Sequence, residues 1–351
     1  LMRFLVILKS KSSGVSYHRL VKPFEKLKEK GHSVDMVEKY HESKIDSDKY
    51  DCLVFNRGLG YNYHDLEIID KFKDKRIKII MDIDDYWVLP DYHPIVWRKD
   101  VDYDAWKGSI VANLAMADYI WTSTEWLKSK IESLVPNTPT VIARNAIDYD
   151  DELQWSEVRG KSRNKDKVVI GYAGSTTHYK DLDALQTPIR RINSNSFLRK
   201  NVVFNLFGVD NKTDVGKKVW NHQAKVMTVQ GRFNNLYLDG GRHVSEYAYF
   251  YDEMDVSIAS VVDNEFNRCK SELKIIEAGA KYTPFIGTDI ITYNRTDANI
   301  DLCGNPDEWV DSMKELILNK HLRAELGKEL GEYVRDNYII DKENQARLSI
   351  L

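Results

Sequence analysis

The sequence predicts an α/β protein made of two doubly wound domains. The first 37 residues follow the order strand, loop, helix, strand, which is the start of a doubly wound sheet. A strand, a glycine-containing loop and a helix follow one another again from Val168 onward. Between these two starts, residues 150–167 are polar and charged without apolar periodicity, as in a linker. A chain of 351 residues is long enough for two domains that each bury a core.

The composition is that of an ordinary globular protein, with 42% hydrophobic and 30% charged residues. A net charge of -3 gives no global case for nucleic acid or for an anionic membrane as partner, although a local patch is not excluded. Cys52, Cys269 and Cys303 are odd in number and far apart, which fits neither a disulfide framework nor a zinc site. We therefore expect a reducing, cytoplasmic location.

No apolar run approaches the roughly 18 to 20 residues of a membrane span, and no signal-peptide pattern is present. The abundance of Lys, Asp, Asn, Ile and Tyr hints at an AT-rich genome, such as that of a phage or of a low-GC bacterium. A phage protein would act in the host cytoplasm.

The first domain is expected at residues 2–155. Short apolar runs predict its strands, at 3–8, 33–37, 51–56, 78–82, 118–122 and 141–145. Helices are expected between them, at 17–30, 64–72, 109–116 and 123–134. Gly31 is expected to end the first helix, and a Ser/Thr cap at residue 123 to begin the last.

The loop after the first strand lies at the strand edge where doubly wound sheets bind ligands. It carries three candidate binding residues, Gly14, Ser16 and His18. A solvated loop beside a lysine-coated helix face is an equally good interpretation of each residue alone.

Three carboxylates, Asp82, Asp84 and Asp85, crowd the end of the predicted strand at 78–82. Such crowding is costly unless a cation or hydrogen-bond donors compensate it, so a site is predicted here. Clustered carboxylates suit Mg²⁺ or Mn²⁺, whereas helix capping or simple exposure are the alternatives without a ligand.

Aromatic side chains are concentrated in residues 86–106, beginning with Tyr86 and Trp87. Aromatic faces stack on sugars and bases, and they also pack between domains. We expect Tyr86 and Trp87 to line an acceptor, with domain packing as the alternative.

The second domain is expected at residues 156–330. Its strands are predicted at 168–171, 202–207, 225–229, 256–262 and 284–287, with helices at 247–254, 271–282, 305–319 and 321–337. The loop after the first of these strands contains Gly174, which would let the backbone approach a phosphate.

Residues 264–289 carry the strongest functional signal. Ser271 is the expected N-cap of a helix on which Lys270, Lys274 and Glu277 share one face. The helix N-terminus and two lysines suit a diphosphate, and Glu277 could accept hydrogen bonds from a ribose. The alternative is an ordinary surface ion-pair series of Lys274, Glu277 and Lys281.

The pattern K-S-x-L-K-x-x-E-A-G-A-x-x-x-P-F-I-G-T at 270–288 resembles the nucleotide-sugar-binding segment of GT-B glycosyltransferases, particularly retaining glycosyltransferase family 4. Weaker similarity covers A-D-Y-I-W-T-S-T-E-W-L at 117–127 and the link at 145–148. The resemblance implies two Rossmann-like domains facing a cleft, with a C-terminal helix at 331–351 packing back on the first domain.

Two positions depart from the family pattern. Cys269 stands where the family usually has a second glutamate, eight residues before Glu277. Ser175 replaces an arginine that holds the diphosphate, while Lys180 keeps the lysine spacing of that loop. We expect Arg268 or Lys270 to supply the missing charge.

By resemblance, the protein would move a sugar from a nucleoside diphosphate sugar to a hydroxyl acceptor with retention, needing neither metal nor cofactor. The donor residues would be Gly14, Gly174, Ser175, His243, Lys270, Ser271, Lys274 and Glu277. Catalysis would fall to Asp85, Lys180 and Lys270, and acceptor binding to His18, Asp84, Tyr86 and Trp87.

The acceptor is open among a glycan, a lipid-linked sugar, a small molecule, a protein and a hydroxylated base in phage DNA. The DNA alternative rests on the composition typical of an AT-rich genome, on the aromatic segment at 86–106 and on a basic cluster that is also ordinary on a solvated helix. This cluster comprises Lys9, Lys11, Arg19, Lys22, Lys26 and Lys28. A relative that binds nucleotide sugars without transfer is a second alternative, motivated by Cys269 and Ser175. An oxidoreductase is disfavoured, because no G-x-G-x-x-G with a following acid stands at a strand end.

Overall fold

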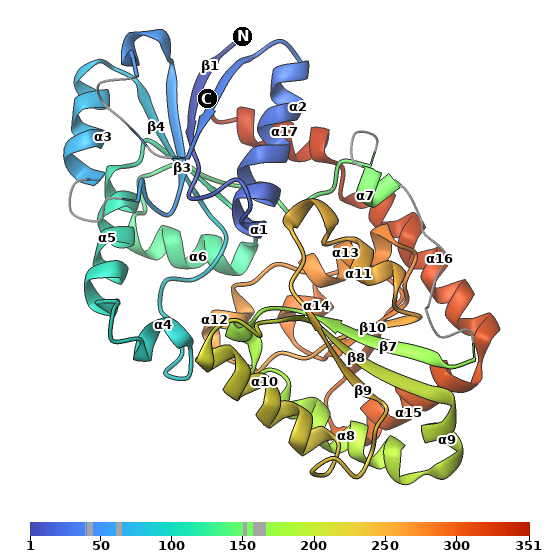
Figure 1. Cartoon of the computed structure of the whole chain (residues 1–351). Coiled ribbons are helices and arrows are strands. Elements are labelled where there is room, and N and C mark those ends of the chain that lie inside the picture. Colours follow the sequence, from blue (N-terminus) through green and yellow to red (C-terminus); the bar gives the residue numbers. More distant parts are fainter. Residues whose placement is uncertain (39, 41–44, 61–64, 150–152, 157–165) are drawn as a thin grey trace. The chain divides into compact units, whose positions relative to one another are not determined.

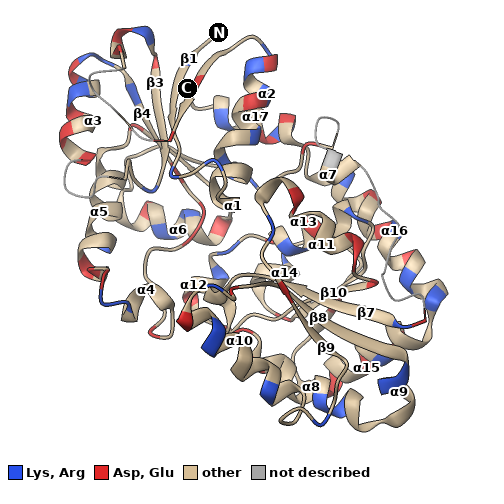
Figure 2. Ribbon diagram, viewed as in Figure 1, with Lys and Arg blue, Asp and Glu red and all other residues tan. Residues whose placement is uncertain are grey.

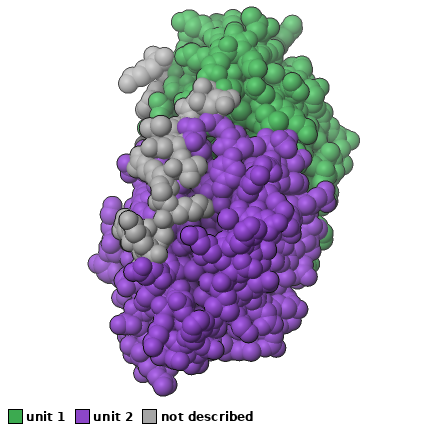
Figure 3. Space-filling model, turned by 90° about the vertical axis from the view of Figure 1, so that its right-hand side faces the viewer, with its two compact units in different colours: residues 1–148, 268–271, 338–351 green, residues 149–267, 272–337 purple. Residues whose placement is uncertain are grey.

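The computed structural model describes residues 1–38, 40, 45–60, 65–149, 153–156 and 166–351 (Figure 1). These residues form two compact units (Figure 3). The first unit comprises 1–148, 268–271 and 338–351, and the second 149–267 and 272–337. Most of the expected linker, at 150–152 and 157–165, lies outside the described residues.

The first unit contains a six-stranded sheet in the order β2-β1-β3-β4-β5-β6, with every neighbouring pair parallel. The strands are β1 Arg3–Ile7, β2 Ser33–Val37, β3 Cys52–Asn56, β4 Lys78–Ile83, β5 Tyr119–Thr122 and β6 Thr140–Ile142. All six occur where apolar runs predict them.

Helices cover both faces of this sheet. The helices are α1 Gly14–Ser16, α2 Lys22–Glu29, α3 Asp65–Asp74, α4 Pro94–Trp97, α5 Tyr103–Met116, α6 Glu125–Leu134 and α17 Ile340–Leu348. A π-helical stretch, Tyr17–Val21, joins α1 to α2, so the expected single helix at 17–30 is composite. Gly31, with φ of +95°, follows its end.

Alternate residues of β1 point into two different cores, as strand geometry requires. Leu5 and Ile7 pack with residues of α3, α5 and α6 on one face. Phe4 and Val6 pack with residues of α2 on the other face, where the end of α17 also lies. Both faces of a parallel sheet are thereby buried.

The second unit contains another six-stranded parallel sheet, in the order β12-β11-β10-β7-β8-β9. Its strands are β7 Val168–Ala173, β8 Val202–Val209, β9 Leu236–Gly240, β10 Val256–Ala259, β11 Phe285–Thr288 and β12 Asp301–Cys303. Its longer helices are α8 Asp183–Ser194, α10 Asp214–Met227, α13 Leu273–Ala280, α15 Pro306–Leu318 and α16 Lys320–Asn337. The shorter ones are α7 Leu153–Ser156, α9 Ser196–Asn201, α11 Tyr249–Asp252, α12 Glu265–Arg268 and α14 Ile291–Asn294.

The strand expected at 225–229 is wrong. Its first half is the end of α10, a helix that begins after the N-cap Thr213 and buries Trp220, Gln223 and Met227 at helical spacing. A short apolar run is ambiguous between strand and buried helix, and here the helical period extends through it. The strand that follows β8 is instead β9, at the edge of the sheet.

Helices α13 and α16 pack closely against one another in the second unit. A Cβ on Gly279 would lie 2.5 Å from the Val334 side chain, so this position of α13 has no room for one. A Cβ on Gly327 of α16 would likewise lie 2.3 Å from the carbonyl oxygen of Tyr282. Gly279 therefore lets the two helices approach closely, and Gly327 lets α16 approach the turn that follows α13.

Charged side chains of both signs are mixed on the helices, for example along α3 and α16 (Figure 2). Among the described residues, no helix combines the length and the apolar character that crossing a membrane requires.

Candidate functional site

The second sheet reverses its strand order between β7 and β10. The chain passes from β7 to β8 and β9 on one side and then places β10 on the other side of β7. Open parallel sheets bind ligands outside the carboxyl ends of the strands at such a reversal. The loops that follow β7 and β10 are therefore where this fold places a site in the second unit.

Asp181 joins these two loops. The Oγ of Ser260 donates to the Asp181 carbonyl oxygen at 2.5 Å, and the backbone N–H of Val262 donates to Oδ1 at 2.8 Å. The side-chain amide of Asn267 donates to the same Oδ1 at 3.1 Å. Asp181 is only 2% exposed, so a buried carboxylate fixes the loops at the strand reversal.

Gly174, expected to approach a phosphate, is a tightly packed residue. A Cβ there would lie 2.3 Å from Oη of Tyr172, and the backbone of Gly208, at φ of +88°, passes beside it. The glycine is thus required by packing, whether or not a ligand also approaches it.

The remaining loop residues carry polar groups. The hydroxyls of Ser175 and Thr177 lie 2.6 Å apart, and Nδ1 of His178 lies 2.9 Å from Oδ2 of Asp181. Lys180 is about half exposed and its Nζ lies 3.3 Å from Asp183. Lys180 is therefore accessible to an anion, because an exposed ion pair of this kind is weak.

The expectation that Ser271 caps the next helix is wrong. Helix α13 begins at Leu273, its N-cap residue is Glu272, and no side chain caps it. Ser271 Oγ instead accepts a hydrogen bond from the side-chain amide of Asn145 at 2.7 Å within the first unit. A pairing with a residue 126 positions away cannot be read from local capping preferences.

Glu277 is the centre of a buried polar cluster on α13. Its Oε2 accepts hydrogen bonds from Oη of Tyr251 at 2.6 Å and from Nζ of Lys274 at 3.0 Å. Nζ of Lys274 also lies 2.6 Å from Oη of Tyr247. The shared face predicted for Lys274 and Glu277 is therefore present.

Burial and charge act together on this cluster. Burial lowers the pKa of Lys274, but Glu277 and Tyr247 outweigh burial and raise it above its usual value. Burial, reinforced by the Glu277 charge, raises the pKa of Tyr251 well above its usual value. At neutral pH the lysine is thus a cation and the tyrosine a hydrogen-bond donor.

The alternative of a surface ion-pair series on α13 is wrong. Glu277 is 2% exposed and Lys281 is fully buried. Nζ of Lys281 lies 3.0 Å from Oδ2 of Asp252, on the neighbouring helix α11. Charged groups are rarely buried so completely unless paired, as these are.

Residues 268–271 belong to the first unit, so the chain enters that unit between Asn267 and Arg268 and leaves it again between Ser271 and Glu272. The carbonyl oxygen of Cys269 accepts from Oγ1 of Thr124 at 2.9 Å, and the Arg268 guanidinium lies over Trp126. Lys270, expected to bind the donor, lies in this segment and is partly exposed.

The Cys269 side chain lies in the hydrophobic core of the first unit, fully buried. A glutamate there would bring a carboxylate into an apolar environment, which is costly without a partner. The structure therefore gives a packing reason for the cysteine at this position.

The first sheet also reverses its strand order, between β1 and β3. Gly14, in the loop after β1, has no atom within 4 Å of where a Cβ would stand. His18 lies on the π-helical stretch, only 7% exposed, with its ring edge-on to Tyr17. Ser16 is buried as well and bonds Ser13, so Gly14 is the accessible member of the three loop candidates.

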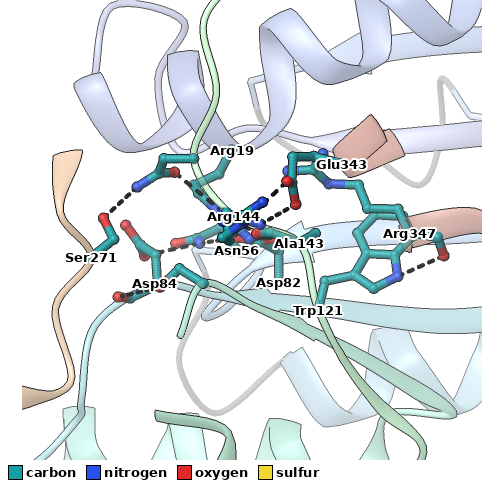
Figure 4. A network of polar contacts seen from close by, with 12 residues as sticks. Arg19, Asn56, Asp82, Asp84, Trp121, Ala143, Arg144, Ser271, Glu343 and Arg347 are labelled. Atoms are coloured by element: carbon teal, nitrogen blue, oxygen red, sulfur yellow. Dashed lines mark hydrogen bonds and ion pairs between the residues drawn. The ribbon is translucent and has the colours of Figure 1, made fainter. Parts of the chain in front are cut away.

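The carboxylate cluster at the end of β4 is neutralised by arginines. Arg19 and Asp82 form a fully buried ion pair with two hydrogen bonds, Nη2 to Oδ2 at 2.7 Å and Nε to Oδ1 at 3.1 Å. Arg19 also donates to the carbonyl oxygen of Ala143 at 2.6 Å and to Asn145 at 3.2 Å (Figure 4). Arg19 is thus not part of a basic surface for DNA.

Asp84 and Asp85 share a second arginine. Nη2 of Arg57 lies 2.9 Å from Asp84 and 2.7 Å from Asp85. Arg57 has φ of +62°, an uncommon conformation for a residue with a side chain, which marks positions that the surrounding structure holds in place. Burial raises the pKa of Asp84, and the charges of Asp85 and Asp82 add to this while Arg57 opposes it.

This cluster does not have the arrangement of a metal site. Within the described ranges, no group of three or more His, Cys, Asp or Glu side chains could hold a metal ion. The partner of Asp82 is instead Arg19, and Asp84 and Asp85 both pair with Arg57.

The two aromatic acceptor candidates differ in exposure. Trp87 is 6% exposed and lies in the hydrophobic core, whereas Tyr86 packs on that core while partly exposed. Trp87 is thus a packing residue of the core, as the alternative interpretation of the aromatic segment expects. His243 is exposed, and its Nδ1 accepts from the N–H of Ser245.

Several residues of these clusters were not predicted as site residues, namely Arg19, Arg57, Tyr247, Tyr251 and Asp181. Each is brought to its partner across 26 or more positions of sequence, as in the pair of Arg19 with Asp82, which are 63 positions apart. The one signal in the sequence was the carboxylate crowding at residues 82–85, which requires cations nearby.

No protein-family model matches this sequence, and no curated protein matches it. Solved structures do match. Anabaena HepE, crystallised with UDP and glucose, matches with a TM-score of 0.68 at 12% identity, over 100% of this chain and 99% of that one. The sucrose-phosphate synthase of Thermosynechococcus elongatus matches with a TM-score of 0.67 at 11% identity, over 99% and 98%.

A variant of S. aureus TarM, crystallised with fondaparinux, α-GlcNAc-glycerol and UDP, matches with a TM-score of 0.60 at 15% identity. This match covers 88% of the present chain, which spans only 57% of the length of TarM. The similarities show a shared fold, with two six-stranded parallel sheets and flanking helices, as in GT-B glycosyltransferases. The predicted fold class is confirmed.

Proposed function

We propose that this chain is a glycosyltransferase that moves a sugar from a nucleoside diphosphate sugar to a hydroxyl acceptor, with retention of configuration. The buried cluster of Lys274, Glu277 and Tyr251, near the strand reversal of the second sheet, is the observation that carries this proposal. The fold supports it, because structures of the same fold were crystallised with UDP.

In this proposal Glu277 accepts hydrogen bonds from the ribose of the donor. A carboxylate that two donors already hold is oriented in advance, so little order has to be gained on binding. Lys274 and Lys180 supply positive charge for the diphosphate, together with Lys270, Ser271 and the backbone at Gly174 and Ser175. His243 and Gly14 are assigned to the donor by resemblance alone.

The catalytic work is then mostly electrostatic. Cations beside the diphosphate stabilise the charge that develops on it as the bond to the sugar breaks. Lys180 and Lys270 have this role, and a diphosphate oxygen accepts the proton of the acceptor hydroxyl. Asp85, with Asp84, Tyr86 and His18, is assigned to positioning the acceptor.

The first prediction tests nucleotide binding. A thermal-shift series with UDP, GDP, ADP and CDP, and then their sugars, should raise the melting temperature for one base. At a ligand concentration of 100 times Kd the gain is about 2.7 kcal/mol. Glu277→Gln should lower the affinity for the nucleotide that binds by about tenfold, because an amide accepts hydrogen bonds from two ribose hydroxyls less strongly than a carboxylate does.

Glu315→Gln, the same substitution at an exposed position of α15, is the matched control and should bind as the wild type does. If no nucleotide binds the wild type, or if Glu277→Gln binds as well as Glu315→Gln, the proposed site is wrong. Nucleotide binding without donor hydrolysis or transfer to any acceptor would favour the non-catalytic alternative.

Once the donor is identified, a screen for sugar transfer from that donor can identify the acceptor. Glycans, lipid-linked sugars, small polyols, proteins and hydroxymethylated DNA are the arms of this screen. The structure weakens the case for DNA, because the basic cluster is partly neutralised. Arg19 is buried, Lys22 pairs with Glu25, and Lys26 pairs with Glu29 and Asp148.

A further inference from the structure

His178 is held by a buried carboxylate where the loops after β7 and β10 meet. Its Nδ1 lies 2.9 Å from Oδ2 of Asp181, and a quarter of its side chain is exposed, against 3% for Asp181. Because Nδ1 faces Asp181, Nε2 lies on the opposite edge of the ring. The hydrogen bond thereby fixes the orientation of the imidazole.

Asp181 is fixed in turn through its other oxygen. Oδ1 accepts from the N–H of Val262 and the side-chain amide of Asn267, both of which are uncharged donors. Such hydrogen bonds keep a buried carboxylate ionised. Oδ2 therefore presents a negative charge to His178, which stabilises a protonated imidazole.

We propose that His178 binds the diphosphate of the sugar donor as an imidazolium, with Asp181 as its positioning residue. This inference rests on the proposed function. With a neutral imidazole the pair carries one negative charge, which repels a diphosphate, whereas with an imidazolium its net charge is zero. Binding therefore draws a proton onto His178, and Nε2–H donates a charge-assisted hydrogen bond to a phosphate oxygen.

The same cation serves during transfer. The bond from the anomeric carbon to the diphosphate oxygen breaks, and its electron pair goes to the diphosphate. The anomeric carbon bonds to the acceptor oxygen, and the acceptor proton passes to a diphosphate oxygen. His178 keeps its own proton and stabilises the leaving group.

The other ionisable groups of this region have partners or stay uncharged. In the same loop, Lys180 pairs with Asp183 at 3.3 Å. Burial raises the pKa of Tyr172 on β7 and of Tyr293 on α14, and the charge of Asp181 raises both further. These tyrosines therefore remain neutral near pH 7.

Helix α10 also contacts this loop, through a hydrogen bond from Nε1 of Trp220 to Oγ1 of Thr176 at 3.2 Å. The indole does not titrate. On α13, Lys274 is held as a cation by Glu277. His178 is thus the group expected to change its charge when a diphosphate binds.

The test is calorimetry with UDP, or with GDP if UDP does not bind, between about pH 7 and 8.5, where the diphosphate itself stays ionised. Measurements in two buffers with different ionisation enthalpies give the number of protons taken up. The wild type should take up a fraction of a proton, and its affinity should fall as the pH rises. His178→Gln should abolish this uptake and weaken UDP binding by about tenfold or more.

Three comparisons show which group is responsible. His178→Lys should restore most of the affinity without proton uptake, because lysine is already charged. Uridine, which lacks the diphosphate, should bind both proteins equally if it binds at all. His321→Gln, the same substitution at a side chain that is 92% exposed, should behave as the wild type does.

UDP binding with a proton uptake that His178→Gln leaves unchanged would overturn this inference while the proposed function stands. An equal loss of affinity for UDP and uridine would also overturn it, since that pattern indicates a purely structural role. If no nucleotide binds the wild type, the proposed function and this inference fail together.

Discussion

At the scale of single residues, two arginines compensate three aspartates at the end of β4. Arg19 forms a fully buried ion pair with Asp82, and Arg57 forms ion pairs with both Asp84 and Asp85. Removing Arg19 or Asp82 leaves its buried partner uncompensated, which costs about 3–5 kcal/mol. Removing the charge of Asp84 differs, because Arg57 still pairs with Asp85.

Asp84→Asn is predicted to stabilise the protein at pH 7. Burial raises the pKa of Asp84 in the folded state, so the folded protein holds this proton more tightly than the unfolded chain does. Stability from this group is present below the unfolded pKa, about 3.9, and is lost as the pH rises toward the folded pKa. The gain from Asp84→Asn should therefore shrink as the pH falls to about 4.

Urea unfolding of both proteins across this pH range measures the difference. Asp311→Asn, on the exposed face of α15, should follow the wild type at every pH. A gain for Asp84→Asn that does not depend on pH would show that the charge of Asp84 is not its cause.

At the scale of elements, the two loops that follow the first strand of each sheet use their glycines differently. Gly174 is enclosed by Tyr172 and Gly208, whereas a Cβ on Gly14 meets open space. The first glycine is needed by the folded protein itself. The second is exposed, and a Cβ there would meet no steric obstacle.

Gly174→Ala is predicted to destabilise the protein by about 1–3 kcal/mol, because the new methyl group would overlap with Tyr172. Gly14→Ala should leave stability within about 0.5 kcal/mol and should lower the affinity for the donor. Thermal unfolding and nucleotide titration of the same two variants measure both effects. Equal donor affinity for Gly14→Ala and the wild type would remove Gly14 from the site.

At the scale of the whole molecule, the C-terminal segment completes the first unit. The indole N–H of Trp121 donates to the carbonyl oxygen of Arg347 at 3.1 Å, and Asn344 donates to the carbonyl oxygen of Pro23 at 2.8 Å. Glu343 accepts from the backbone and side chain of Arg144. These contacts tie α17 to strands and helices from the beginning of the chain.

Truncation after Asn337 is predicted to destabilise the first unit by at least about 3 kcal/mol, because it uncovers Trp121 and leaves its indole N–H without its partner. The loss should appear as an early unfolding transition in calorimetry, with the second unit unfolding near its usual temperature. Lys30→Ala, which removes only an exposed ion pair with Asp341, should change stability by no more than about 0.5 kcal/mol. Coincident transitions in the truncated and complete proteins would contradict this prediction.

The sequence predicted the central strands of both sheets, because each buried strand of a parallel sheet is a short apolar run that can be recognised from its own residues. The predicted polar face of Lys274 and Glu277 is present for the same reason, since a spacing of three residues on a helix is a local matter. The edge strands β9 and β12 of the second sheet were missed because their burial is incomplete and their apolar patterns are correspondingly weak.

What the sequence could not show is pairing over long distances. From the sequence alone, Ser271 is expected to cap a helix, but in the structure it bonds Asn145. Arg19 is expected in a basic surface patch, but in the structure it pairs with the buried Asp82. Trp87 reads as an exposed stacking platform until the core around it is known. In each case the sequence shows which side chain is present, but it does not show which distant residues that side chain contacts in the fold.

The return of α17 to the first unit has a consequence for synthesis on the ribosome. Residues 1–148 emerge first, but the helix that covers Trp121 follows only after residues 149–337. At about 5–20 residues per second, the roughly 190 residues in between take on the order of 10–40 seconds. During that interval the apolar surface around Trp121, which Leu348, Ile350 and Leu351 later cover, is exposed to solvent in the nascent chain.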